Sequence, residues 1–387
     1  MMMRRVMLGW AIALLSVVVG LAGCTPVSAE ARLFLPLSLE FVDEYVLPDQ
    51  SLADLPVGGL SAIAYDRPRD RFHLLSDDSG TGADSRLYTA QIRLNGNEPT
   101  APQIASVELE SVTPIRTTAQ ADPTAEILDL EGVALSPRQT VLIASEGNAD
   151  AGIAPGITEF ELATGQALRS LPIPQRYMPQ TVDGQTMGVR QNLAFEALTL
   201  LSSGSTISEG YVEPFRVFAA TESALAQDVP TDANAPIPIR LLHYLMGEDL
   251  PTLLAEHLYY LDSSADLLLV NGLTELLAID QGGHFLALER TLGLNGFGAK
   301  VYQLAIANAT DTSGIPKFVG DLSSIQPIRK QLVLDLAELG LTLDNLEGMT
   351  LGPRLPDGSQ SLVLISDNNF RPEQKTQLLL FRLDGLN

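Results

Sequence analysis

The feature that most constrains the fold of this chain is a pattern that occurs five times along it. Each copy starts with a short apolar run, passes through a turn, and returns in a second apolar run that ends at an acidic residue. The second positions of the five patterns, residues 61, 131, 196, 275 and 347, lie 70, 65, 79 and 72 residues apart. Short apolar or alternating runs bounded by turn residues are typical of β-strands. The sequence therefore predicts a repeating all-β structure.

Two further strands follow in most copies of the pattern. We expect third strands at 87–92, 157–162, 241–245, 301–306 and 378–383, and fourth strands at 104–109 and 167–173. Four antiparallel strands per unit at a steady spacing predict a β-propeller. Five blades is the prediction; a sixth blade built from residues 240–270, or a pair of β-sandwiches, is the alternative.

The two ends of the chain suggest how the ring closes. The last copy stops after its third strand, close to the end of the sequence, whereas an unassigned strand at 37–47 stands near the beginning. We expect this N-terminal strand to complete the last blade, because closure of the ring hides sheet edges that would otherwise be exposed.

The first residues have the form of an export signal. Arg4 and Arg5 precede an apolar stretch and the small residues that end at Gly23, which is typical of a secretory leader. The run Leu-Ala-Gly-Cys at 21–24 resembles the bacterial lipobox, and this implies that Cys24, the only cysteine of the chain, carries lipid. The alternative is an ordinary cleavage site followed by a chance cysteine.

The expected organisation is thus a lipoprotein signal peptide at 1–23, a lipid-anchored tether at 24–32 and a propeller domain at 33–387. We expect a membrane-anchored protein of the cell envelope that faces the periplasm or the exterior and touches the membrane through its lipid only. The formal net charge of −23 argues against nucleic acid and anionic lipid as partners, and makes cations plausible ones.

Acidic residues recur at two places in the pattern. Because the first two strands of a blade are antiparallel, the start of the first and the end of the second lie at the same face of the ring. The starts carry Glu131, Glu196, Glu275 and Glu347, with Ser61 in the first copy; the ends carry Asp77 with Asp78, Glu146, Glu222, Glu289 and Asp367. We expect these carboxylates to converge at one mouth of the ring.

Converging carboxylates repel one another and raise one another's pKa unless a cation compensates. Ca²⁺ takes six to eight oxygen ligands and suits such a site. The predicted metal ligands are Asp77, Glu131, Glu146, Glu196, Glu222, Glu289, Glu347 and Asp367. Four cations, Arg86, Arg290, Lys300 and Lys375, stand near the same ends of the strands and could hold an anionic group. The alternative for each acid is a structural role, in which the carboxylate accepts backbone N–H groups of the next blade.

Several of these segments resemble one family. Residues 129–133, 345–349 and 365–370, together with 58–63, 75–80 and 195–198, are similar to motifs of the phytase-like domain family, also described as "esterase-like activity of phytase". The resemblance covers about 35–386. It implies a secreted propeller and Ca²⁺-dependent cleavage of phosphate monoesters. The catalytic candidates that it implies are Glu131, Glu196, Glu347, Asp367, Arg290 and Lys300.

Other chemistries find no support in the sequence. The chain has no Gly-x-Ser-x-Gly element and no phosphate-binding glycine loop, so neither a serine esterase of the α/β-hydrolase type nor a nucleotide-binding protein is indicated. The expected function is Ca²⁺-dependent hydrolysis of a small anionic ester or phosphoester. A non-catalytic ligand- or partner-binding propeller with structural Ca²⁺, and a lactonase-type hydrolase, remain as alternatives.

Overall fold

The computed structural model describes residues 33–77, 85–95, 102–116, 129–201, 213–232, 234–262 and 268–386. The chain divides into two units, Met1–Leu35 and Pro36–Asn387, and the fold below is that of the second. The predicted leader, Cys24 and the tether lie outside the described residues. Within the described ranges, no helix has the length and apolar character needed to cross a membrane.

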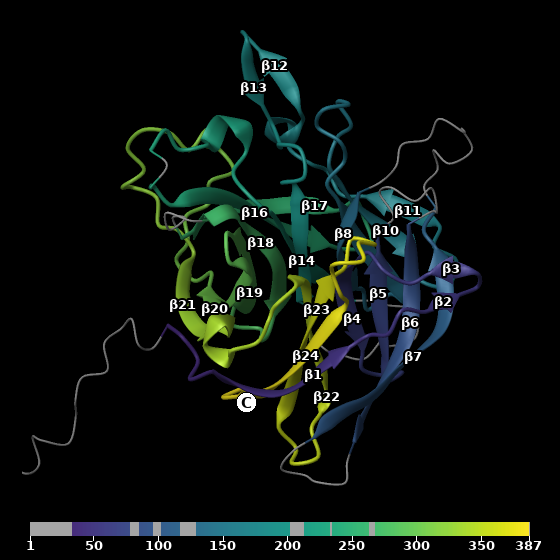
Figure 1. Ribbon diagram of the computed structural model, residues 1–387. Helices are drawn as coiled ribbons and strands as arrows, with labels where there is room; N and C mark the ends of the chain where they lie inside the picture. The colour runs from purple at the N-terminus through teal and green to yellow at the C-terminus, as the bar shows by residue number, and fades with distance from the viewer. Residues whose placement is uncertain are drawn as a thin grey trace, which may run out of the picture. The chain divides into compact units, whose positions relative to one another are not determined.

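Five four-stranded antiparallel sheets account for most of this unit (Figure 1). Blade 1 contains β4 (Leu60–Asp66), β5 (Arg71–Ser76), β6 (Arg86–Asn95) and β7 (Gln103–Pro114). Blade 2 contains β8 (Leu130–Leu135), β9 (Thr140–Ser145), β10 (Gly156–Glu161) and β11 (Ala167–Ser170). Blade 3 contains β14 (Phe195–Leu201), β15 (Phe215–Thr221), β16 (Ile237–Met246) and β17 (Thr252–Leu261).

The remaining two sheets follow the same plan. Blade 4 contains β18 (Leu268–Ala278), β19 (His284–Gly293), β20 (Gly296–Ala305) and β21 (Arg329–Asp335). Blade 5 contains β22 (Asn345–Arg354), β23 (Gln360–Asp367), β24 (Gln377–Asp384) and β1 (Ser38–Val46). The first strands contact one another in the ring order β4, β8, β14, β18, β22 and back to β4. The fold is therefore a five-bladed β-propeller, as predicted, with these strands around its central channel.

The N-terminal strand closes the ring in the predicted way. β1 pairs antiparallel with β24, from Ser38 opposite Asp384 to Val46 opposite Gln377. The sixth blade that we held open does not exist, because residues 237–261 form the two outer strands of blade 3. The chain therefore joins its two ends within a single sheet.

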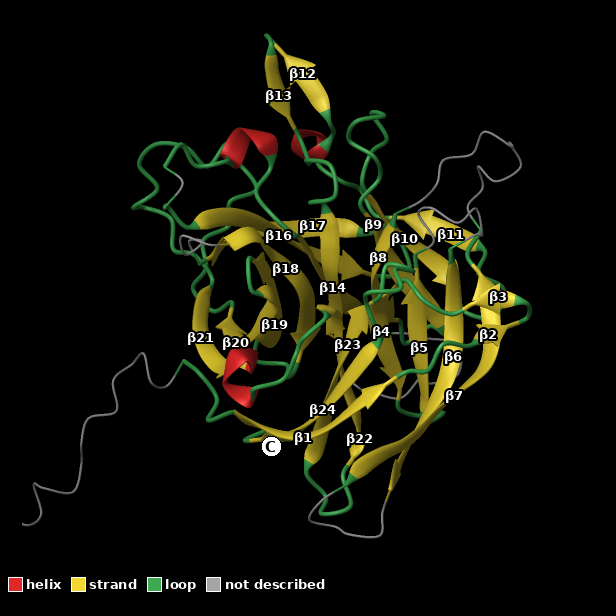
Figure 2. Ribbon diagram, viewed as in Figure 1, coloured by secondary structure: helices red, strands yellow, loops and turns green. Residues whose placement is uncertain are grey.

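Small elements lie outside the blades (Figure 2). They are the hairpins β2–β3 (Ser51–Leu52, Leu55–Pro56) and β12–β13 (Gln180–Val182, Gln185–Met187), and the 3₁₀ helices η3 (Gln175–Tyr177), η4 (Ala226–Asp228) and η5 (Leu336–Leu339). The described residues contain no α-helix.

The hydrophobic core lies between neighbouring blades. Leu142 and Ile157 of blade 2, for example, belong to one buried cluster with Phe195 and Leu198 of blade 3. Equivalent clusters join blades 1 and 2, blades 3 and 4, and blades 5 and 1. A sheet that is covered on both faces favours continuous apolar runs over strict alternation, and β23 is accordingly buried along its whole length. Each fully buried Val, Leu, Ile or Phe side chain of this core stabilises the folded state by about 1.5–3 kcal/mol.

Candidate functional site

A β-bulge recurs at the same place in all five inner strands. The register between the first and second strands of every blade shifts by one residue near the strand start. The extra residues are Ser61, Glu131, Glu196, Thr274 and Glu347. A bulge bends the strand and re-aims the side chain that it carries. Glu131, Glu196 and Glu347 are thereby brought to one end of the channel. We call this end, with the carboxylates around these three residues, the acidic mouth.

Glu275 differs from the other strand-start acids that the sequence suggested. The extra residue of β18 is Thr274, and Glu275 is the next residue along. Its counterparts in the other blades are Ala62, Gly132, Ala197 and Gly348. The other four blades thus carry alanine or glycine at this position, and Ala62 and Ala197 pack in the clusters between blades.

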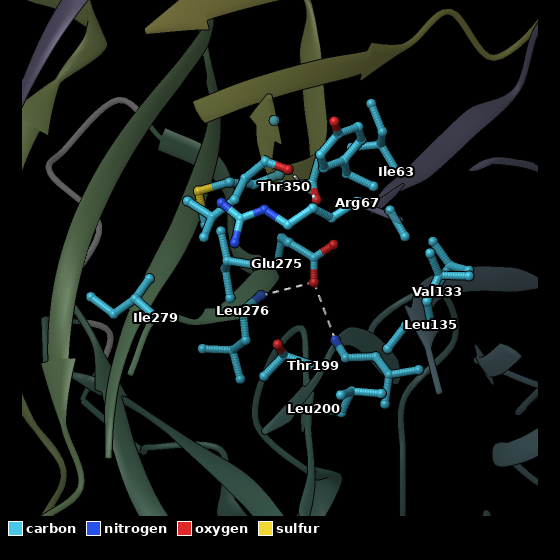
Figure 3. Close-up of a pocket in the computed structure, with 18 of the residues that line it drawn as sticks. Ile63, Arg67, Val133, Leu135, Thr199, Leu200, Glu275, Leu276, Ile279 and Thr350 are labelled. Carbon is cyan, nitrogen blue, oxygen red and sulfur yellow. Dashed lines mark hydrogen bonds between the residues drawn. The ribbon is translucent and has the colours of Figure 1, made fainter. Parts of the chain in front are cut away.

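The carboxylate of Glu275 is only 2% exposed and lies inside the channel. It accepts the backbone N–H groups of Leu276 at 2.9 Å and Leu198 at 3.3 Å, as Figure 3 shows, and also that of Met349. These amides belong to blades 4, 3 and 5. Burial raises the pKa of Glu275 well above its ordinary value, although the amide hydrogen bonds oppose that shift. Glu275 therefore has the structural role that we held as the alternative for each acid.

Glu289 also lies away from the acidic mouth, which corrects its expected placement. It pairs with Leu273, whereas the position that carries an acid in the other four blades is taken in blade 4 by Arg290. A slip of one residue moves a strand side chain to the opposite face of the sheet. The Glu289 carboxylate instead accepts hydrogen bonds from Tyr259 and, at 2.7 Å, from Lys330. It is thus held by an ion pair of its own.

One group of carboxylates bridges blades 1 and 2. Oxygens of Asp77, Asp129 and Glu131 all lie within 4.8 Å of one another. Burial raises the pKa of Asp129, while its hydrogen bonds with Asp77 and Glu131 act in the opposite direction. Burial, and then the charge of Glu347, raise the pKa of Glu131 well above its usual range. We had not selected Asp129 as a ligand, although it directly precedes its strand in a quoted motif.

A second group joins blades 2 and 3. Oxygens of Glu146, Glu196 and Glu222 lie within 4.8 Å of one another, and all three residues are buried. Glu146 accepts the backbone N–H of Ala194. Burial first, and then the charge of Glu222, raise the pKa values of both Glu146 and Glu196 well above the ordinary value. The Oε2 atom of Glu196 is buried and has no hydrogen-bond partner among the described residues.

Space for the second group depends on a glycine of the next blade. A Cβ atom at Gly272 would lie 2.1 Å from Oε1 of Glu222. A carbon atom cannot lie so close to a carboxylate oxygen, so any residue with a Cβ atom at position 272 would displace the Glu222 side chain. The glycine thus lets β18 pass directly beside this carboxylate.

Arg290 links the second group to blade 5. Its guanidinium donates to Glu222 at 2.6 Å and to Glu347 at 2.7 Å, and also to Asn345. Asp367 lies in the same region, and burial raises its pKa to about 6. The Arg290 guanidinium is therefore already engaged by the protein's own carboxylates.

The other predicted cations also have partners in the protein. Lys300 lies 3.7 Å from Asp335, and Lys375 lies 3.0 Å from Glu44 of β1. Arg86 is almost fully buried, where it donates to the hydroxyl of Tyr88 at 2.6 Å. Arg190, which sequence reasoning missed, donates to Ser223 and Ala224 directly after Glu222. Asp78 lies outside the described residues.

The donor set suits a hard divalent cation. Each group offers three carboxylate oxygens that can approach one point, and Ca²⁺ prefers oxygen ligands at about 2.3–2.6 Å. Burial of like charges at such distances is costly without a counterion, and Glu196 has an oxygen that no protein donor satisfies. The residues present therefore fit one cation in each group.

The fold and the acidic mouth define a five-bladed β-propeller with clustered carboxylates at one end of its channel. A family model described as "Phytase-like: Esterase-like activity of phytase" matches residues 55–370, and the chain belongs to this family. A search of curated proteins finds no match.

Two solved structures show a distant likeness. The catalytic domain of a Coprinopsis cinerea GH62 α-L-arabinofuranosidase is 10% identical, with a TM-score of 0.42 over 90% of this chain and 98% of that one. An endo-arabinase from Bacteroides thetaiotaomicron is 10% identical, with a TM-score of 0.42 over 87% and 96% of the two chains. At such TM-scores the likeness carries no argument about activity.

The central position of Glu275 predicts a large effect of its removal. Glu275→Ala leaves three backbone N–H groups in the channel without their acceptor, and each such loss costs about 1–3 kcal/mol. We expect the free energy of unfolding, measured with denaturant, to fall by about 3 kcal/mol or more. Glu161→Ala, on an exposed stretch of β10, should change it by less than about 0.5 kcal/mol. Equal stability of Glu275→Ala and wild type would contradict the structural role.

The raised pKa values predict how the metal-free protein responds to pH. The folded state keeps protons on these carboxyls at pH values at which the unfolded chain has lost them. The part of the free energy of unfolding that these groups supply is therefore fully present below about pH 4 and is lost as the pH rises. Asp367, whose pKa rises from 3.8 to about 6, accounts for about 3 kcal/mol of this loss between those values. The mouth glutamates extend the loss to higher pH.

The measurement is thermal unfolding in chelator from pH 4 to pH 8. Glu196→Gln removes one raised group, so its melting temperature should fall less steeply with pH than that of wild type. Saturating Ca²⁺ should reduce the slope of the wild type in the same way. Identical slopes for wild type and Glu196→Gln would show that the acidic mouth does not control this dependence.

Proposed function

We propose that this chain is a cell-envelope lipoprotein whose propeller binds Ca²⁺ at the acidic mouth and hydrolyses phosphoesters or related esters there. The observation that carries the proposal is the pair of three-carboxylate groups around one end of the channel. Membership of the phytase-like family supports the same reaction class.

The two groups would hold one ion each. Asp77, Asp129 and Glu131 supply the oxygens of the first site, and Glu146, Glu196 and Glu222 those of the second. Bound Ca²⁺ offsets the carboxylate charge and can polarise the oxygen of a phosphoryl or acyl group. Since Arg290 is bound by two carboxylates of the protein, the anionic part of a substrate would depend largely on this added charge.

Glu347 is the residue that we propose takes the proton from the attacking water. Both of its hydrogen bonds, from Arg290 and from the side chain of Asn345, are made by Oε1. These bonds fix the carboxylate and leave Oε2 as the atom that can accept a proton. Its side chain is 11% exposed, which is enough for contact with a water molecule in the mouth. Arg290 is then a positioning residue that orients Glu347 and Glu222.

A binding function without turnover is the second candidate. The observation that favours it is the engagement of Arg290 by two carboxylates, because this guanidinium is then not available to hold a phosphate. In that case Ca²⁺ would tie blades 1, 2 and 3 together and shape the mouth for a ligand.

The test separates metal binding from turnover. The chain from Thr25 onward is stripped with chelator, titrated with Ca²⁺ by calorimetry, and assayed on an aryl phosphate and an aryl ester. Glu196→Gln should weaken Ca²⁺ binding at least tenfold. Glu347→Gln should keep Ca²⁺ affinity within about threefold but lower turnover by 100-fold or more, as expected for loss of a general base.

Glu159→Gln is the matched control. Glu159 is 2% exposed and pairs with Arg169 at 2.6 Å in blade 2, apart from both carboxylate groups. This variant should bind Ca²⁺ and turn over substrate like wild type. Cleavage of neither substrate, with Ca²⁺ raising only the melting temperature, would establish the second candidate and overturn the hydrolase.

The proposed anchor has its own test. Wild-type protein expressed in bacteria with labelled palmitate should incorporate the label. It should also sediment with membranes, because a lipidated cysteine would carry more than one acyl chain and several chains together anchor a protein stably. Cys24→Ser should lose both properties. An unlabelled wild-type protein that remains in the soluble fraction would exclude the lipoprotein assignment.

A further inference from the structure

A second hollow lies at the other end of the channel from the acidic mouth. It has a volume of about 430 Å³, and the inner strands of all five blades line it. We call it the funnel, and define it by Ala64, Ala134, Thr199, Leu277 and Thr350, which lie two residues beyond the level of Glu275 and its small counterparts (Figure 3). Pockets of about 300–1,000 Å³ with mostly apolar walls and a few polar groups are the usual form of small-molecule sites.

The walls of the funnel present apolar surface. Leu135, Leu200, Ile279 and Leu351 also line it. The hydroxyl of Thr199 accepts the backbone N–H of Ala278, and that of Thr350 donates to the carbonyl of Leu351. Both hydroxyls thus form hydrogen bonds with backbone groups of the wall. An apolar body would bury surface against the leucine, isoleucine and alanine side chains of the funnel.

Two arginines among the lining residues supply positive charge. Arg67 lies in the turn directly after β4, and Arg354 is the last residue of β22; both are exposed. Arg67 donates to the side chain of Gln360 at 3.4 Å, and Arg354 donates to the carbonyl of Gly358 at 2.8 Å. Neither guanidinium has a carboxylate partner among the described residues. In so acidic a chain, two arginines without acidic partners at one cavity favour an anionic ligand group.

The floor of the funnel sets the orientation of a ligand. Glu275 lines the cavity, and its carboxylate already accepts three backbone N–H groups. It does not need a ligand donor, and it occupies the channel between the funnel and the acidic mouth. A negative group would therefore be drawn to the arginines. The apolar part would then point inward.

We propose that the funnel binds a small amphiphilic anion, with an alkyl or aryl body between the five inner strands and a single negative head group against Arg67 and Arg354. This site is separate from the acidic mouth and needs no Ca²⁺. The head group can be a carboxylate, a sulfate or a phosphate, because each presents the oxygens that a guanidinium binds.

The test compares octanoate, octylammonium and octanol by calorimetry with the chain from Thr25 onward in chelator. Octanoate should bind at one site per chain, at least tenfold more tightly than octylammonium. Octanol should lie between them, since it has the same body without the charge. Addition of Ca²⁺ should leave the affinity for octanoate unchanged, which separates this site from the acidic mouth.

Reversal of the charge at Arg67 gives the decisive variant. Arg67→Glu changes an exposed residue and should fold normally, and it should weaken octanoate binding at least tenfold while octanol binding changes little. Arg93→Glu, at an exposed site of β6 away from the funnel, is the matched control and should bind octanoate like wild type. Absence of octanoate binding, tighter binding of octylammonium, or unchanged binding by Arg67→Glu would each overturn the proposal.

Discussion

The β-bulge near the start of each inner strand is the constraint on which the rest of this site depends. Without the extra residue, Glu131, Glu196 and Glu347 would alternate with their neighbours in regular register and point elsewhere. The same bulge decides what fills the channel one residue further on. Four blades place alanine or glycine there and the fifth places Glu275, so one local irregularity, repeated five times, creates both the acidic mouth and its floor.

Blade 4 reduces the repulsion between the carboxylates of the acidic mouth. At the position where the other blades bring an acid, it brings Arg290, which binds carboxylates of blades 3 and 5. At the bulge it brings Thr274, whose hydroxyl lies within hydrogen-bonding distance of carbonyls of β19 and β22. An acid at either place would add to the charges that already raise the pKa of Glu131 and Glu196. Blade 4 therefore places no acid at these two positions, and its Gly272 and Arg290 lie directly beside Glu222 of the second carboxylate group.

The repeats predict the blades well because strand order and closure depend on patterns that span many residues. The five units, most strand positions and the pairing of the N-terminal strand all follow from spacing and apolar character. The placement of single residues in blade 4 does not follow. The run 274–279 has an acid in its second position like three of the other four copies, and nothing in its composition shows that the bulge falls on Thr274. Glu289 was misplaced by the same single-residue slip. Asp129 and Asn345 stand at equivalent positions, one residue before Leu130 and Leu346, and that shared position was the signal that could have found them. Ion pairing of Lys300 and Lys375 with residues distant in sequence could not be predicted from spacing.

The pairing of β1 with β24 has a consequence for biosynthesis. β1 is synthesised before the other strands of all five blades, whereas its partner β24 is synthesised after the other strands of the ring. Loop closure over so many residues carries an entropic cost that grows slowly with length, and contacts of such high sequence separation are formed slowly. The ring cannot close until β24 has been made. Until then the strands of blade 5 keep an open sheet edge, at which another chain can pair.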